Sequence, residues 1–427
     1  MKVLSYKTNN TLKKIVLSLC LVLFLCNCKG VKNSISKRSK QAFKERFNKN
    51  QFTGVCILDP STKDTVFTHN STTYFTPASN TKIFTLYSAL KILPNKIPTL
   101  KYRIVKDTLY AEGTGDPTLL HPYFKDRSSL NFLKKFKHIA FNFSNYKDTK
   151  FGPGWAWEDY DASFSPERNA MPVYGNLLTI QNTKTLHTTP VYFKDRVFKS
   201  TSISGREIHE NIFYYNPKVK DTLEIPFITS PETTKHILED ILEKNIRMVP
   251  KLPKGPKSTL YSIATDTVYK RMMHKSDNFL AEQLMVMSSG VLKDTLNFSS
   301  AKNYILNTYL KELKQKPRWV DGSGLSRYNL FTPESLVHVL HKLYKEVPKE
   351  RLFCLFPPVY QNNTQKEAVY LYAKSGSLGN TYCLSGFLKT RSGKTLIFSF
   401  MNNHFRQRNS EIKRQMHAFL QEIRDRY

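Results

Sequence analysis

Ser79 and Lys82 are the pair of residues in this sequence best suited to nucleophilic chemistry. They lie in the stretch TPASNTK at residues 76–82, where a Pro and cap-type polar residues precede apolar residues at helical spacing, so a helix is predicted to begin near Ser79. Residues three apart lie on one helix face, which lets the Lys82 amine reach the Ser79 hydroxyl. The helix N-terminus also favours negative charge there. A nucleophile and a base are thereby placed together.

The triplet Ser276-Asp277-Asn278 is a second candidate. It lies between two helical patterns, where a turn can present Ser276 and Asn278 to a cleft. The alternative is an ordinary N-cap for a helix that begins at Phe279. The triplet alone does not decide between these two interpretations.

Lys374, Ser375 and Gly376, followed by Ser377, end an apolar strand-like run. A cation, a hydroxyl and a Gly that allows close backbone approach suit a carboxylate ligand laid along the strand edge. A basic hairpin turn is the alternative.

The elements that position these residues come from both ends of the chain. Two strand-like runs with a turn between them, and later three more joined by Ser/Gly turns, predict one antiparallel five-stranded sheet. A final helix is predicted from about Ser410, with apolar residues on one face. The strand-like runs are Phe52–Asp59, Thr65–His69, Ala368–Lys374, Tyr382–Phe387 and Thr395–Met401.

The middle of the chain divides into two parts. Residues 96–255 have short strand-like runs, many Pro and Gly and little helical periodicity, which predicts a β-rich domain inserted after the first motif. Residues 51–95 and 256–427 then form the catalytic domain. Helices are predicted there at Thr267–Met273, Phe279–Ser288, Ala301–Leu313 and Pro333–Tyr344.

The three motifs in this order resemble the active-site set of the β-lactamase and penicillin-binding protein superfamily. The long segment between Ser79 and Ser276, with several local matches, resembles the low-molecular-mass class C penicillin-binding proteins, the D-alanyl-D-alanine carboxypeptidase/endopeptidase family. The matches cover residues 76–403, nearly all of the chain after its leader. They are TPASNTK at 76–82, GDPTL at 115–119, GWAW at 154–157, NAM at 169–171, DGSGLSR at 321–327 with Thr332-Pro333, and KSGS at 374–377. The last departs from the family in having Ser375 where Thr is usual, which keeps the hydroxyl.

The resemblance implies an α+β, β-lactamase/transpeptidase-like fold with helices on both sides of the sheet. It implies a serine-type D-Ala-D-Ala carboxypeptidase, with or without endopeptidase action, that acts on peptidoglycan stem peptides and is inhibited covalently by β-lactam antibiotics. It implies no metal or organic cofactor.

The resemblance also implies residue roles. Ser79 would attack the bond between two D-Ala residues, and Lys82 would take its proton, with an amine pKa lowered by burial beside Lys374. Ser276 would relay a proton to the departing D-Ala, and Asn278 would hold Lys82 and the substrate amide. Lys374 and Ser375 would bind the terminal carboxylate, and Gly376 would let the backbone come close to the ligand. The N–H groups of Ser79 and Ser377 would form the oxyanion hole.

Two other functions use the same features. A β-lactamase or esterase would share the acyl-serine chemistry and differ in losing the penicilloyl group quickly. A catalytically idle wall-binding or scaffold protein would keep the fold alone.

The N-terminus predicts export. Basic residues precede an apolar run from Ile15 to Leu25, which is too short to span a bilayer, so residues 1–27 are interpreted as a signal peptide. Cys28 follows in a sequence that resembles a bacterial lipobox, with Cys26 as the alternative lipid site and an ordinary cleaved signal as the third possibility. Residues 28–50 are predicted to be a basic linker or N-terminal helix. The basic residues would attract anionic lipid headgroups, or the segment would form a short amphipathic helix that docks on the fold. We therefore expect a periplasmic lipoprotein tethered to a membrane.

Composition agrees with this compartment. The 427 residues suffice for two or three domains at roughly 100–200 residues each. The net charge of +31 must be solvated or matched by an anionic partner such as lipid or wall polymer. Export argues against nucleic acid as that partner. Past the signal, Cys56, Cys354 and Cys383 are an odd number, which argues against a disulfide framework.

Overall fold

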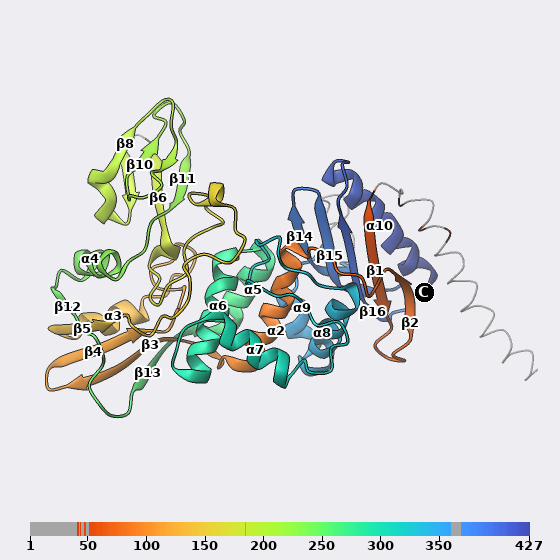
Figure 1. Ribbon diagram of the computed structural model, residues 1–427, viewed down its shortest axis with the longest axis horizontal. Helices are drawn as coiled ribbons and strands as arrows, with labels where there is room; N and C mark the ends of the chain where they lie inside the picture. The colour runs from red at the N-terminus through yellow and green to blue at the C-terminus, as the bar shows by residue number, and fades with distance from the viewer. Residues whose placement is uncertain (1–40, 42, 44–46, 48–50, 184, 360–368) are drawn as a thin grey trace, which may run out of the picture.

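The computed structural model describes residues 41, 43, 47, 51–183, 185–359 and 369–427. The predicted signal peptide, Cys26 and Cys28, and all but three residues of the predicted linker lie outside this range. Figure 1 shows one sheet at one end of the molecule, helices in the middle and the residues of the predicted insert at the other end.

The predicted five-stranded sheet is confirmed. Its strands are β1 (Phe52–Leu58), β2 (Thr65–His69), β14 (Leu371–Leu378), β15 (Thr381–Lys389) and β16 (Thr395–Asn403), in the order β14-β15-β16-β1-β2. Every neighbouring pair is antiparallel. Phe52 lies opposite Asn403, so the sheet joins the two ends of the described chain.

Helices cover both faces of this sheet, as the resemblance implied. Successive strand side chains point to opposite faces, so Ile397 and Met401 of β16 pack in one core and Phe398 and Phe400 in another. The first core includes α2 (Lys82–Ile92) and α8 (Pro333–Glu346), and the second is closed by α10 (Asn409–Arg426).

The helical layer holds each helix predicted for it and one more. The observed helices are α5 (Thr265–Lys275), α6 (Asn278–Lys293), α7 (Phe298–Thr308), α8 and the unpredicted α9 (Lys349–Leu355). Helix α7 ends at Thr308, not at the predicted Leu313. Among the described residues, no helix is long and apolar enough to cross a bilayer.

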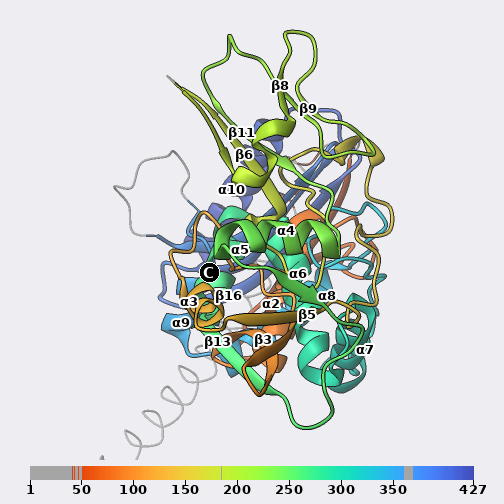
Figure 2. The same cartoon turned by 90° about the vertical axis from the view of Figure 1, so that its left-hand side faces the viewer.

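The segment predicted as an insert builds three small sheets around its own core. The largest has the order β12-β5-β4-β3-β13, and the others have the orders β11-β6-β7 and β8-β10-β9. Figure 2 shows α4 between the largest sheet and the two smaller ones. The bounds are β3 (Lys96–Val105), β4 (Thr108–Gly113), α3 (Ser128–Lys134), β5 (His138–Asn142), β6 (Leu177–Asn182), β7 (Leu186–Thr189), β8 (Val197–Lys199), β9 (Gly205–Arg206), β10 (Phe213–Tyr215), β11 (Thr222–Pro226), α4 (Pro231–Leu242), β12 (Ile246–Met248) and β13 (Ser258–Ala264).

Two observations refine the picture of this segment. It contains α3 and α4, and α4 has a Ser230 cap followed by Pro231 that the sequence interpretation did not use. Strand β13 lies beyond the predicted boundary at residue 256 and pairs with β3, so this sheet extends past that boundary. The division into domains stays a prediction.

Candidate active site

Ser79 and Lys82 lie at the junction of a short 3₁₀ helix, η1 (Ala78–Thr81), and α2. Residues three apart are aligned in a 3₁₀ turn, and Lys82 Nζ lies 3.0 Å from Ser79 Oγ. Ser79 is half-buried, whereas Lys82 is fully buried. The predicted proximity of the hydroxyl and the amine is therefore present in the structure.

Three oxygen atoms surround the Lys82 amine. Besides Ser79 Oγ, they are Asn278 Oδ1 and the Ser323 carbonyl oxygen, each 2.7 Å from Nζ. The last two can only accept hydrogen bonds, so a neutral amine gives them its two N–H groups and turns its lone pair to the Ser79 hydroxyl. After proton transfer, the ammonium has three donors for the same three oxygens. One geometry thus serves both protonation states.

Burial favours the neutral form of the Lys82 amine. It lowers the pKa of the Lys82 amine to about 8, although the carboxylates of Asp321, Glu282 and Asp277 oppose this. The expected contribution of Lys374 to that lowering is wrong, because the charges that act on Lys82 are acidic. The influence runs the other way: burial, together with the Lys82 charge, lowers the pKa of Lys374 well below its usual range.

Asn278 and Asp277 divide two tasks at the start of α6. Asp277 is the N-cap and accepts from the Leu280 N–H at 3.0 Å, which leaves the Asn278 side chain for Lys82. Asn278 Nδ2 donates to the Phe164 carbonyl at 3.0 Å, which turns Oδ1 toward the amine. The N-cap interpretation therefore holds, although α6 begins at Asn278 and not at the predicted Phe279. The functional interpretation of the triplet stays a prediction.

Ser276 ends α5 in a left-handed conformation, with φ 55°. Its side chain is half-buried, and among the described residues its hydroxyl makes no hydrogen bond. Among the described residues, no hydrogen bond joins the Ser276 hydroxyl to Ser79 or Lys82.

Strand β14 brings Lys374 and Gly376 against the start of α2. A Cβ added at Gly376 would lie 2.8 Å from Ser79 N and 2.6 Å from the Pro77 carbonyl oxygen, so only Gly fits there. Asn80 Nδ2 donates to the Lys374 carbonyl at 2.9 Å and fixes the register of strand and helix.

Side chains alternate along this part of β14. Lys374 is buried and its Nζ donates to the Ser375 carbonyl at 2.7 Å, whereas the Ser375 and Ser377 side chains are exposed. Ser377 Oγ accepts from Asn409 Nδ2 at 3.2 Å. The hydroxyls of the third motif therefore face solvent, where a ligand can meet them.

A buried ion pair beneath Lys82 was not predicted. Glu282 Oε1 accepts from the N–H of Ser323, whose carbonyl holds Lys82, at 2.7 Å. Glu282 Oε2 lies 3.4 Å from Arg168, and both side chains are 1% exposed. Burial and the nearby Asp321 raise the pKa of Glu282 to about 7, against the effect of Arg168. Through Ser323, the ion pair is therefore connected to the Lys82 amine.

Asp321 organises the turn that carries Ser323. Its carboxylate accepts from Gly324 N at 2.8 Å, Ser326 N at 2.7 Å and Trp155 Nε1 at 2.9 Å. The stretch DGSGLSR was noted in the sequence only as a resemblance. Its density of Gly and Ser around one Asp was the available signal for a built turn.

Among the residues that the structure describes, no three His, Cys, Asp or Glu side chains come together in a group that could hold a metal ion.

The comparison with known families decides the identity of this arrangement. The sequence model of the D-Ala-D-Ala carboxypeptidase 3 (S13) family matches residues 38–196 and 259–423. The chain belongs to this family.

Relatives agree with this assignment. The D-alanyl-D-alanine carboxypeptidase DacB of Haemophilus influenzae is 23% identical over 418 residues, which cover 84% of this chain and 87% of the relative. The penicillin-sensitive carboxypeptidase A of Dictyostelium discoideum is 23% identical over 430 residues, or 81% of each chain.

Among solved structures, penicillin-binding protein 4 of Haemophilus influenzae matches with a TM-score of 0.73 and 20% identity, over 89% of this chain and 98% of that one. Its complex with a β-lactam matches with a TM-score of 0.64. The predicted family, the fold and the class of enzyme, a serine-type D-Ala-D-Ala carboxypeptidase, are confirmed. The residue roles stay predictions.

Proposed function

We propose that this enzyme removes the terminal D-Ala from peptidoglycan stem peptides through an acyl-enzyme on Ser79. The observation that carries the proposal is the buried Lys82 amine, 3.0 Å from Ser79 Oγ with its other two contacts at acceptor oxygens. That arrangement leaves one direction for a proton to enter, and Ser79 occupies it.

Acylation begins when Ser79 Oγ attacks the carbonyl carbon between two D-Ala residues and its proton passes to Lys82. The developing oxyanion accepts from the backbone N–H groups of Ser79 and Ser377, and one such donor contributes about 3–4 kcal/mol in measured hydrolases. The close approach of Gly376 to Ser79 N supports this pairing. As the C–N bond breaks, Ser276 gives its hydroxyl proton to the departing D-Ala amine and takes one from the Lys82 ammonium, which returns Lys82 to its neutral form. Water then attacks the ester and regenerates Ser79.

Lys374 and Ser375 bind the terminal carboxylate. A buried amine of lowered pKa gains a proton when an anion arrives beside it, because the ion pair offsets the cost of burying the charge. Recognition of a carboxylate at this strand gives preference for a chain end.

We further propose that the enzyme cleaves DD-cross-links, binds β-lactams covalently at Ser79, and is exported and held at a membrane through lipid on Cys28. The solved complex of penicillin-binding protein 4 with a β-lactam supports the second point. The basic and apolar order of residues 1–27 supports export.

The deciding experiment is intact mass spectrometry after brief exposure to benzylpenicillin. We expect one stable penicilloyl adduct on the protein and none on Ser79→Ala. Ser34 makes a matched control, because it also stands three residues before a lysine, Lys37, and Ser34→Ala should keep the adduct.

Two other outcomes would contradict the proposal. Rapid penicillin turnover without an adduct would indicate a β-lactamase. Absence of both adduct and turnover would leave the wall-binding scaffold. Release of D-Ala from a stem pentapeptide then tests the substrate directly, and a cross-linked dimer tests endopeptidase action.

A further inference from the structure

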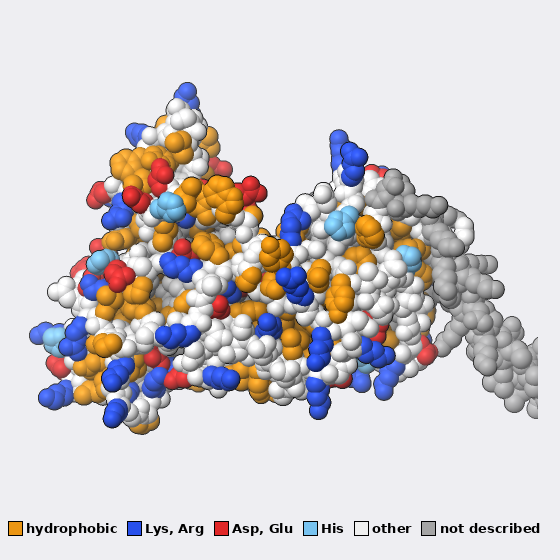
Figure 3. Space-filling model, in the orientation of Figure 1, with side chains coloured by type: hydrophobic (Ala, Val, Ile, Leu, Met, Phe, Trp, Pro, Cys, Tyr) orange, Lys and Arg blue, Asp and Glu red, His pale blue; other side chains and the backbone are white. Residues whose placement is uncertain are grey.

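A cavity of about 460 Å³ lies in the predicted insert, beside the proposed active site. Its walls include Phe151, Trp155, Trp157 and Tyr160 from one stretch of chain and His209 from the loop after β9. In Figure 3 the surface is hollowed between this part of the molecule and the five-stranded sheet, with hydrophobic side chains gathered on the insert side. Small-molecule sites are hollows of this size with a largely apolar lining.

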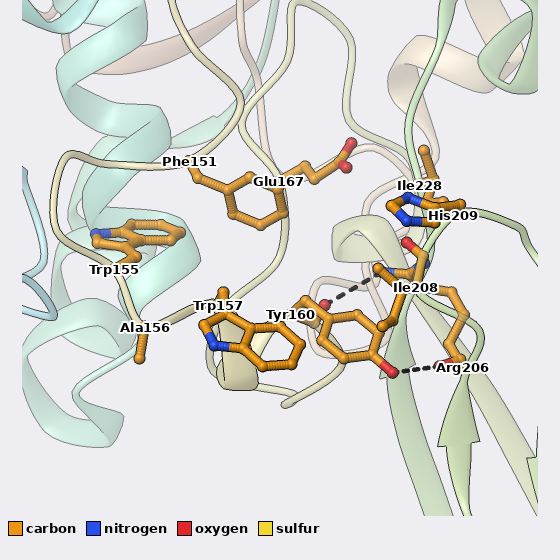
Figure 4. Close-up of a pocket in the computed structure, with 10 residues that line it drawn as sticks. All are labelled: Phe151, Trp155, Ala156, Trp157, Tyr160, Glu167, Arg206, Ile208, His209 and Ile228. Carbon is orange, nitrogen blue, oxygen red and sulfur yellow. Dashed lines mark hydrogen bonds between the residues drawn. The ribbon is translucent and has the colours of Figure 1, made fainter.

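Two of the aromatic walls, Trp155 and Tyr160, are held in place by hydrogen bonds. Trp155 Nε1 donates to Asp321, and the Tyr160 hydroxyl donates to the Arg206 carbonyl at 2.7 Å (Figure 4). Trp157, by contrast, is 75% exposed. A large ring that stays in water at the mouth of an aromatic cavity gains contact area when a ligand covers it.

One buried carboxylate that lines the cavity can still accept a hydrogen bond. Glu167 is 5% exposed and lies across the pocket from Trp157 in Figure 4. Its Oε2 accepts from Thr229 N at 2.7 Å and Thr229 Oγ1 at 2.6 Å, with Lys150 3.2 Å away. No group among the described residues reaches Oε1. A carboxylate oxygen is a strong acceptor for a hydroxyl or amide N–H.

Charge selects the kind of ligand. The Glu167 charge is already matched by Lys150, so a cationic ligand gains little there. An anion finds no ready donor, because the Arg206 guanidinium donates to the backbone carbonyls of Pro226, Glu207, Ile208 and Tyr160. The best ligand is neutral, with an apolar ring face and hydrogen-bond donors at its edge.

We infer that this cavity binds a sugar ring of the peptidoglycan glycan strand. A pyranose has C–H faces that pack on aromatic rings, and its hydroxyl and acetamido groups would donate to Glu167. The inference rests on the proposed function, since a stem peptide is attached to a strand of N-acetylated amino sugars. Trp155 joins the two sites, because it lines the cavity and contacts Asp321, which organises the Ser323 turn.

The test is to titrate the protein with tri-N-acetylchitotriose, a peptide-free glycan, and to measure binding by calorimetry and by tryptophan fluorescence. We expect saturable binding that weakens at least tenfold in Trp157→Ala and is largely restored in Trp157→Phe. Tyr261→Ala removes another exposed aromatic ring, from β13 and outside the cavity, and should bind like the natural protein. The acylation rate with benzylpenicillin checks that each variant is folded.

No binding of chitotriose at millimolar concentration, or equal binding by Trp157→Ala, would overturn the inference. Binding of N-acetyl-lysine methylamide in its place would overturn it too, in favour of a cationic ligand. Chitotriose binding without D-Ala release would contradict the proposed function alone, so the two failures are distinguishable.

Discussion

Replacing Asn278 by Asp changes the charge next to the proposed base with little change in shape. Asn278 Oδ1 lies 2.7 Å from Lys82 Nζ. At that distance, two unit charges attract by about 1.5 kcal/mol in bulk water and about 6 kcal/mol at an effective dielectric of 20. Since one pKa unit corresponds to about 1.4 kcal/mol, Asn278→Asp should raise the pKa of Lys82 from about 8 by at least about one unit.

The acylation rate follows from this change, because only the neutral amine can take the Ser79 proton. In the natural protein the rate should rise with pH and level off above about 8. At pH 7 roughly one amine in ten is neutral, and with the raised pKa roughly one in a hundred. We therefore expect Asn278→Asp to be acylated about tenfold more slowly at pH 7 and to regain most of this loss at pH 10.

The assay is the second-order rate constant for penicillin acylation from pH 5 to 10. Asn278→Ala removes the same contacts without adding charge, so its rate should fall while its acid limb does not move to higher pH. Asn297→Asp changes an N-cap of α7 and should match the natural protein. An unchanged acid limb in Asn278→Asp, with a rate lowered equally at every pH, would refute Lys82 as the base.

Three further predictions each concern one residue. Gly376→Ala should slow acylation at least a hundredfold in stopped-flow measurements, because the added Cβ would lie 2.8 Å from Ser79 N; an unaffected rate would mean that the strand does not border the site. Arg168→Met should lower the free energy of unfolding by about 3–5 kcal/mol, since it leaves Glu282 buried without its partner. Because folding raises the pKa of Glu282, the free energy of unfolding of the natural protein falls as pH rises from about 4.5 to 7. This fall should be larger in the variant. Urea unfolding of the variant and the natural protein at pH 5 and pH 8 checks this. An equal difference in the free energy of unfolding between the two proteins at both pH values would contradict it. Cys28→Ser should move the protein from the membrane fraction to the soluble fraction; retention in the membrane would exclude Cys28 as the lipid site.

The sheet could be predicted because its strands carry local signals. Strands β1 and β2 are short apolar runs around one turn, and β14 to β16 repeat that pattern near the end of the chain. If all five strands form one sheet, a strand of the first group must pair with a strand of the second, and in the structure β1 pairs with β16. The end of α7 was missed because apolar residues up to Leu313 kept helical spacing after the helix had ended.

The site could be predicted only where a motif is short. Ser79 and Lys82 are neighbours because helical geometry makes them so, whatever the rest of the fold does. Arg168 and Glu282 are 114 positions apart, and nothing local distinguishes them from surface charges. The source of the Lys82 pKa shift was also misjudged, because it depends on which charges the fold brings to one buried point. Sequence gives the types of those charges and not their separation.

Residues 155–168 connect the segment predicted as an insert to the proposed active site at three separate points. Trp155 donates to Asp321, the Phe164 carbonyl orients Asn278, and Arg168 pairs with Glu282. Through Ser323 and Asn278, these contacts reach both oxygens that hold the Lys82 amine in line with Ser79. The segment therefore does more than extend the surface. Because a misplacement of about 1 Å can cost a hundredfold in rate, a shift of this stretch would alter catalysis without touching the nucleophile, and a glycan bound against Trp155 would lie where it could influence that position.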